Sequence, residues 1–301
     1  MKRLRTAFFL MFGLILLPGA QTAFADLPNG TKYGLEWIND WSNSSCSELD
    51  LTRLYYRDDV INQFASVLQD ANGTQAFLYS QSNVHADHAI EDYNFSGYDY
   101  VFADNVQIYA FAGHGGVYNM TIGNLPQQKY MAAYYASGNS NYSQQVITSS
   151  DYDCVSESHQ CVFGESSSIS NFGTHSGSLR WLIYSTCHSV DTAPAQQWIT
   201  AQQYGVDMIL GYRGEATDGE TTDENLADFG TDVFEGTSAF KQAWFDANED
   251  WWIDDYPSLV TCDSVNTNQT AQYRLNNYNR TWTKRQHDGS TMNCYSAYTQ
   301  G

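Results

Sequence analysis

Apolar residues along the chain gather in short runs separated by polar stretches, and in one stretch they recur at helical spacing. The runs predict five β-strands, at Tyr33–Trp37, Thr74–Tyr79, Val106–Ala112, Leu179–Tyr184 and Val206–Leu210. Leu51–Gln69 places its apolar residues three and four positions apart, which predicts a helix ending near Asn72-Gly73. A weaker pattern predicts a helix over His85–Tyr93. Ala193–Tyr204 is also predicted as a helix, with Asp191 or Thr192 as its N-cap and Pro194 in its first turn. Strands that alternate with helices are typical of an α/β protein with a mostly parallel sheet.

The amino-terminal segment has the pattern of a cleavable signal peptide. Basic residues at positions 2, 3 and 5 precede an apolar run over 7–17, and Ala23-Phe24-Ala25 follows as a small-residue cleavage site. The apolar run is shorter than the roughly 20 residues that a membrane-spanning helix needs. The sequence therefore predicts a secreted protein, cleaved after Ala25, without membrane insertion.

Two regions interrupt the alternation of strands and helices. Residues 126–176 are rich in Ser, Asn, Tyr and Gln and poor in aliphatic side chains, as in a long, hairpin-like insertion. Residues 257–301 show no clear periodicity and predict a C-terminal extension that packs on the domain. We expect a signal peptide at 1–25, one α/β domain at 26–256 containing the insertion, and the extension at 257–301.

The composition is strongly acidic, with 34 Asp and Glu against 14 Lys and Arg and a formal net charge of −20. Such a surface repels nucleic acid phosphates and anionic lipids, so neither is an expected partner. The 22 tyrosines and 8 tryptophans supply ample apolar area for a large core.

Six cysteines occur, at Cys46, Cys154, Cys161, Cys187, Cys262 and Cys294. An even number in an exported protein favours disulfides, and proximity in the sequence suggests Cys154–Cys161 and Cys262–Cys294. Cys46 and Cys187 remain. Either they form a disulfide with each other, or Cys187 is a free thiol. The predicted function depends on which of these two states is present.

Two predicted strands are each followed by a side chain that can take part in catalysis. Val106–Ala112 leads into Gly113-His114-Gly115-Gly116, and Leu179–Tyr184 leads into Ser185-Thr186-Cys187-His188. In a parallel sheet, catalytic groups collect at the carboxyl ends of strands. If the two strands are neighbours, His114 can accept the proton of a Cys187 nucleophile, while the N–H groups of Gly115 and Cys187 hold a developing oxyanion.

An apolar block ending in His-Gly, followed by an apolar block ending in a small residue and Cys, resembles the cysteine peptidases of the caspase, gingipain and legumain superfamily. The resemblance covers roughly residues 30–245 and includes a late helix near Gly236–Trp244. It implies a three-layer caspase-like α/β fold with a mostly parallel central sheet, a His114–Cys187 dyad, an oxyanion donor at Gly115, a protein or peptide substrate and no cofactor. Thr186 departs from the family pattern, where Ala is commoner.

Several alternatives stay open. Substrate specificity is expected in the segment Gly211–Glu215, where Arg213 favours an acidic residue before the scissile bond and Glu215 or Asp218 a basic one. A second function is a non-catalytic secreted binding or adhesion domain on the same fold, with Cys187 in a disulfide. His85 and His88 with Cys187-His188 make a poor zinc signature, so no metal site is predicted.

Overall fold

The computed structural model describes residues 27–28, 30–39, 53–84, 88, 101–122, 125–135, 144–148, 161–163, 178–190, 206–235, 238–249, 255–264, 268–279 and 292–299. Several predictions fall outside these residues: the signal peptide at 1–25, Cys46, Cys154, the helix Ala193–Tyr204 and, apart from His88, the helix His85–Tyr93.

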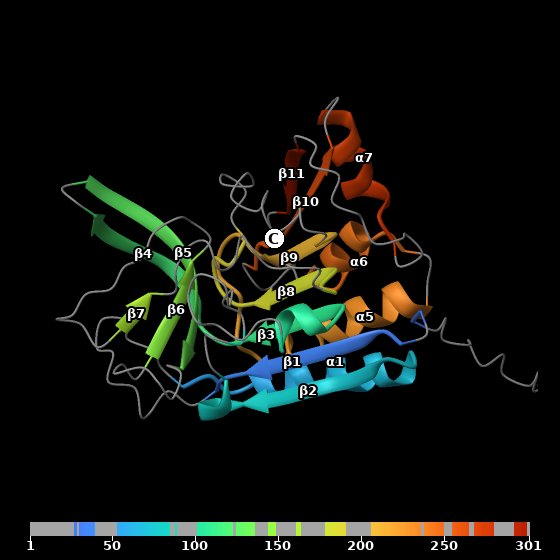
Figure 1. Cartoon of the computed structure of the whole chain (residues 1–301), viewed down its shortest axis with the longest axis horizontal. Helices are drawn as coiled ribbons and strands as arrows, with labels where there is room; N and C mark the ends of the chain where they lie inside the picture. The colour runs from blue at the N-terminus through green and yellow to red at the C-terminus, as the bar shows by residue number, and fades with distance from the viewer. Residues whose placement is uncertain are drawn as a thin grey trace, which may run out of the picture.

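A seven-stranded mixed sheet forms the centre of the protein, in the order β11-β10-β9-β8-β3-β1-β2 (Figure 1). Its strands are β1 (Lys32–Trp37), β2 (Thr74–Ser80), β3 (Ile108–Ala112), β8 (Trp181–Ser185), β9 (Met208–Tyr212), β10 (Pro257–Ser264) and β11 (Met292–Tyr298). The five strands from β2 to β9 across the sheet are parallel, whereas β10 and β11 run antiparallel to their neighbours. The predicted α/β class and mostly parallel sheet are confirmed.

The central strands are buried on both faces, which explains their near-continuous apolar sequences. In β3, Ile108, Ala110 and Ala112 join one core cluster, while Tyr109 and Phe111 join a second cluster on the opposite face. The first cluster also contains apolar residues of the helices α1 (Arg57–Asp70), α5 (Asn225–Glu235), α6 (Phe240–Asp246) and α7 (Asn268–Asn277). Two short 3₁₀ turns lie at Gln81–Asn83 and Ala103–Asn105. None of the helices in the described part of the chain is long and apolar enough to cross a membrane.

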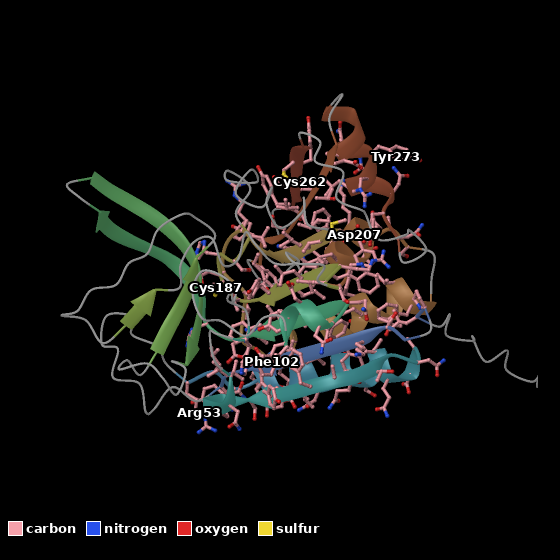
Figure 2. The ribbon with its side chains drawn as sticks, in the orientation of Figure 1. Arg53, Phe102, Cys187, Asp207, Cys262 and Tyr273 are labelled. Carbon is pink, nitrogen blue, oxygen red and sulfur yellow. A yellow bond between two sulfur atoms is a disulfide. The ribbon has the colours of Figure 1, made fainter. Side chains whose placement is uncertain are left out.

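The segment after residue 257 is more regular than its sequence suggests, because it supplies β10, α7 and β11 and so completes the central sheet. Cys262 and Cys294 lie opposite each other in the β10–β11 ladder and form a disulfide, as predicted (Figure 2). At the start of β9, the buried carboxylate of Asp207 accepts hydrogen bonds from Arg180 at 2.8 Å and Tyr278 at 2.8 Å. This network ties the end of α7 to the sheet.

The polar insertion contains a second, four-stranded sheet in the order β4-β5-β6-β7. Its strands are β4 (Gly115–Ile122), β5 (Leu125–Tyr135), β6 (Gln144–Thr148) and β7 (Cys161–Phe163). The sheet begins directly after His114, so it starts earlier than the predicted boundary at 126. In Figure 1 it stands beside the carboxyl ends of the parallel strands of the central sheet. The chain therefore passes from His114 into a separate layer next to the candidate site.

Candidate active site

His114 and Cys187 follow neighbouring strands at equal distances from a paired position. Strands β3 and β8 are parallel partners, with Ala112 opposite Ser185. His114 and Cys187 each lie two residues beyond this pair. Figure 2 shows Cys187 at the edge of the central sheet that faces the second sheet. The two strands are therefore neighbours, which is the condition that the His114–Cys187 hypothesis requires.

Gly115 brings the chain after His114 into contact with the backbone at Cys187. A Cβ atom at Gly115 would collide with the carbonyl oxygen of Cys187 and lie 2.7 Å from Thr186 Oγ1. Thr186 is fully buried, and its hydroxyl has no hydrogen-bond partner among the described residues. Only glycine permits this close approach, so Gly115 has a packing role in addition to its predicted role as an oxyanion donor.

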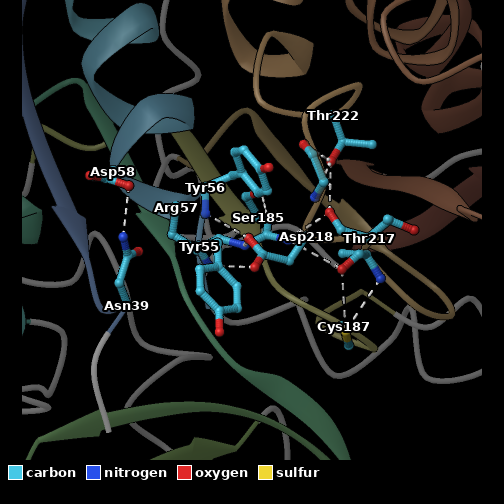
Figure 3. A network of polar contacts seen from close by, with 12 residues as sticks. Asn39, Tyr55, Tyr56, Arg57, Asp58, Ser185, Cys187, Thr217, Asp218 and Thr222 are labelled. Atoms are coloured by element: carbon cyan, nitrogen blue, oxygen red, sulfur yellow. Dashed lines mark hydrogen bonds and ion pairs between the residues drawn. The ribbon is translucent and has the colours of Figure 1, made fainter. Parts of the chain in front are cut away.

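Cys187 carries a free, half-buried thiol (Figure 3). The backbone N–H of Ala216 donates to Sγ at 3.3 Å, and Sγ lies 3.6 Å from the carbonyl oxygen of the same residue. Burial raises the pKa of the Cys187 thiol to about 11, and Glu215 adds to the increase, while the Ala216 N–H and Arg57 oppose it. Cys187 therefore rests as a neutral thiol at neutral pH.

A tight turn after β8 fixes the position of Cys187. His188 has a φ of 51°, in the left-handed region, and its N–H donates to the carbonyl oxygen of Gly214 at 2.7 Å. The Ser189 hydroxyl lies 2.9 Å from the Thr186 carbonyl oxygen and accepts the Tyr212 N–H at 3.2 Å. A positive φ in a non-glycine residue is stable only where surrounding contacts enforce it. Here those contacts come from the turn itself, from Tyr212 at the end of β9 and from Gly214 just after it.

Arg57, which no sequence motif indicates, joins three parts of the chain around the thiol. Its guanidinium donates to Ser185 Oγ at 3.0 Å and to the carbonyl oxygens of Ala216 at 3.3 Å and Thr217 at 2.6 Å. Its Nε lies 3.2 Å from the Asp218 carboxylate (Figure 3). A sequence signal existed, because helical spacing places Arg57 on the buried face of α1.

The loop over residues 216–218 is held by two carboxylates. Asp218 accepts backbone N–H groups from Tyr55 at 2.5 Å and Tyr56 at 3.1 Å, so it fixes the start of α1. One oxygen of Asp255 accepts the backbone N–H and the hydroxyl of Thr217, at 2.8 and 2.7 Å. Burial raises the pKa of Asp255, and the hydrogen bonds from Thr217 lower it. Ala216, in this loop, contacts the Cys187 sulfur. The hydrogen bonds of Asp218 and Asp255 therefore fix the position of the backbone groups next to the thiol.

The two residues of opposite charge that the sequence proposes for specificity lie in different surroundings. The Arg213 guanidinium lies 4.2 Å from the centre of the Tyr298 ring on β11. The Glu215 carboxylate is exposed and lies 3.6 Å from Nε2 of His188. Nδ1 of His188 faces the carbonyl oxygen of Arg213 at 2.9 Å, so this nitrogen carries a proton.

A second polar cluster lies elsewhere in the core. Glu36, fully buried on β1, accepts the Tyr109 hydroxyl at 2.6 Å and lies 2.6 Å from Nδ1 of His88. His88 is thus engaged with Glu36, and His85 lies outside the described residues. Within the described ranges, no three His, Cys, Asp or Glu side chains gather as metal ligands would.

One family model matches the chain, and its description is a domain of unknown function (DUF6345). The match covers residues 35–298, from β1 to β11, and so includes both sheets, His114 and Cys187. No curated protein and no solved structure matches the chain. Because the match spans most of the sequence, the chain belongs to the DUF6345 family.

Proposed function

We propose that the protein is a secreted cysteine endopeptidase of caspase-like fold, with Cys187 as the nucleophile and His114 as the general base. The observation that carries the proposal is the placement of a free thiol and a histidine at equivalent positions after two adjacent parallel strands. The close approach of Gly115 to Cys187 supports it further. A nucleophile beside a base is the arrangement that acyl transfer requires.

In the proposed reaction, His114 takes the thiol proton as Sγ attacks the carbonyl carbon of the substrate and the C–S bond forms. The N–H groups of Gly115 and Cys187 stabilise the oxyanion. His114 then gives the proton to the leaving amine as the C–N bond breaks, which leaves a thioester. A water molecule, deprotonated by His114, attacks the thioester. The C–S bond breaks, the acid product leaves and the thiol is restored.

Export to an oxidising compartment is part of the proposal. The Cys262–Cys294 disulfide fits an extracellular protein, since such bonds persist mainly outside the cytosol. The basic, apolar and small-residue pattern over 1–25 supports the same conclusion. The mass of the mature protein tests it, because cleavage after Ala25 leaves Asp26 as the first residue.

One observation favours a second function, a non-catalytic secreted binding or adhesion domain. The burial that raises the pKa of the Cys187 thiol to about 11 is typical of a structural cysteine rather than of a resting thiolate. The disulfide expected in this alternative is not present, because Cys187 is a free thiol in the structure.

The deciding experiment incubates the mature protein with a diverse peptide mixture and identifies cleavage products by mass spectrometry. We expect hydrolysis by the wild type and a loss of at least about a hundredfold in Cys187→Ala and His114→Ala, as for other catalytic nucleophiles and bases. Asp70→Asn, an exposed change at the far end of α1, serves as the control. Equal cleavage by wild type and Cys187→Ala, or no cleavage by any protein, would favour the binding domain.

A further inference from the structure

We propose that Glu215 is a specificity-determining residue of the Cys187 site and selects a positively charged side chain at the substrate residue whose carbonyl group is attacked. The inference rests on the proposed peptidase function and names its substrate class. It decides between two choices that the sequence leaves open, an acidic residue recognised by Arg213 and a basic residue recognised by Glu215.

The chain places Glu215 beside the nucleophile. Glu215 directly precedes Ala216, whose N–H and carbonyl oxygen are the backbone groups within 3.3 and 3.6 Å of the Cys187 sulfur. Its carboxylate lies 3.6 Å from the ring of His188, the residue after Cys187. The carboxylate is therefore on the Cys187 side of the loop that follows β9.

Arg213 is directed to the opposite side of the same loop. In the sheet order β8-β9-β10-β11, Cys187 follows β8 and Arg213 follows β9. The Arg213 guanidinium stacks on Tyr298 of β11, across β10 and away from β8. Its backbone N–H donates to Tyr256 at 2.8 Å, which holds this part of the loop against the start of β10. An acidic side chain bound next to Cys187 would face Glu215 rather than Arg213.

The other nearby charges already have partners within the protein. The Arg57 side chain is 4% exposed and is engaged by Asp218, Ser185 and the loop carbonyl oxygens, whereas the Glu215 side chain is 73% exposed. Asp218 and Asp255 accept hydrogen bonds from the chain itself. Of the two charged groups that alter the pKa of Cys187, Glu215 and Arg57, Glu215 is the one exposed to a ligand. A substrate cation can therefore reach the Glu215 carboxylate, which faces the partly exposed His188 ring at 3.6 Å and is itself largely exposed.

The test uses three peptidyl acyloxymethyl ketones that differ only at the residue next to the ketone, which is Lys, norleucine or Glu. Each is incubated with the mature protein, and the rate of labelling at Cys187 is followed by mass spectrometry. We expect the Lys reagent to react fastest and the Glu reagent slowest. In Glu215→Gln, the Lys preference over norleucine should fall by roughly 1.5-fold to fivefold, the range for one exposed ion pair. Asp70→Asn and Arg213→Gln should keep the wild-type preference.

Neutral iodoacetamide separates a specificity effect from a general loss of thiol reactivity. Glu215 raises the pKa of Cys187. In Glu215→Gln, Cys187 should therefore react with iodoacetamide as fast as in the wild type or faster. Equal rates for the three ketones, a faster Glu reagent, or a Lys preference that survives in Glu215→Gln would overturn the role of Glu215. If iodoacetamide modifies Cys187 and none of the ketones does, the peptidase function itself fails.

Discussion

Cys187 is subject to opposing influences, and its burial is the strongest of them. An N–H from Ala216 and the positive charge of Arg57 favour the thiolate, yet the loss of water around the sulfur outweighs both and raises the pKa to about 11. At pH 7, roughly one thiol in ten thousand is then ionised. A reaction at this sulfur needs a base that removes the proton during the attack, which is the role proposed for His114.

The raised pKa predicts the pH dependence of Cys187 alkylation. Raising the pKa favours the neutral form, so the reactive thiolate accumulates only as the pH approaches 11. The rate constant with iodoacetamide should increase about tenfold per pH unit above pH 7 and level off only near pH 11. Peptide mapping after timed labelling measures this rate at Cys187 alone. A plateau near pH 7 would contradict the buried thiol and indicate a resting thiolate.

At the scale of secondary-structure elements, the Arg57–Asp218 pair connects the start of α1 to the ends of β8 and β9. Both side chains are largely buried, and Asp218 also accepts the N–H groups before the helix. Removing one partner of a buried ion pair leaves the other charge without compensation, which costs more than the pair contributes when intact.

Arg57→Met should therefore lower the free energy of unfolding by about 3 to 5 kcal/mol. Denaturant titration followed by circular dichroism measures the change. Arg53→Met is the matched control, since Arg53 is exposed and such surface changes stay within about 0.5 kcal/mol. A loss below about 1 kcal/mol in Arg57→Met would mean that the network contributes little to stability.

Among the elements that the sequence predicts correctly, the strands buried on both faces have the clearest pattern. The runs over β3, β8 and β9 are almost wholly apolar, so their pattern does not depend on the rest of the fold. Strands β10 and β11 alternate apolar and polar residues over short distances and gain their burial from the sheet they join. The start of β4 was missed because its first two residues, Gly115 and Gly116, have the composition of a turn.

The residues of the candidate site differ in the same way: local sequence patterns indicate some of them and not others. His114 and Cys187 follow apolar runs, so local patterns indicate them. Arg57 was missed because its partners are far away in the sequence: Ser185 is 128 positions and Ala216 is 159 positions further along the chain. The helical spacing shows that Arg57 is buried, but it does not show which distant residues Arg57 contacts. The sequence alone also does not show which of Arg213 and Glu215 lies on the Cys187 side of the loop, because that depends on the order of the strands in the sheet.

At the scale of the whole molecule, the net charge of −20 is spread over a single chain of 301 residues. Repulsion among like charges destabilises a compact state, and dissolved salt screens it. The same field attracts cations, which agrees with the substrate class proposed for Glu215.

Raising the NaCl concentration from about 0.01 to 0.5 M should therefore increase the Tm, because the Debye length falls from roughly 30 Å to a few ångströms. Differential scanning calorimetry measures the shift. Because screening depends on ionic strength, KCl at the same concentration should give the same increase. A Tm that falls with added NaCl would indicate that favourable ion pairs, rather than repulsion, dominate the surface.

The buried thiol also has a consequence for the redox chemistry of the protein. Thiol–disulfide exchange requires a thiolate that attacks a disulfide sulfur, so its rate depends on the ionised fraction of the attacking cysteine. With a pKa of about 11, Cys187 supplies very little thiolate at neutral pH. The same chain can therefore keep a reduced cysteine and the oxidised Cys262–Cys294 pair without scrambling them.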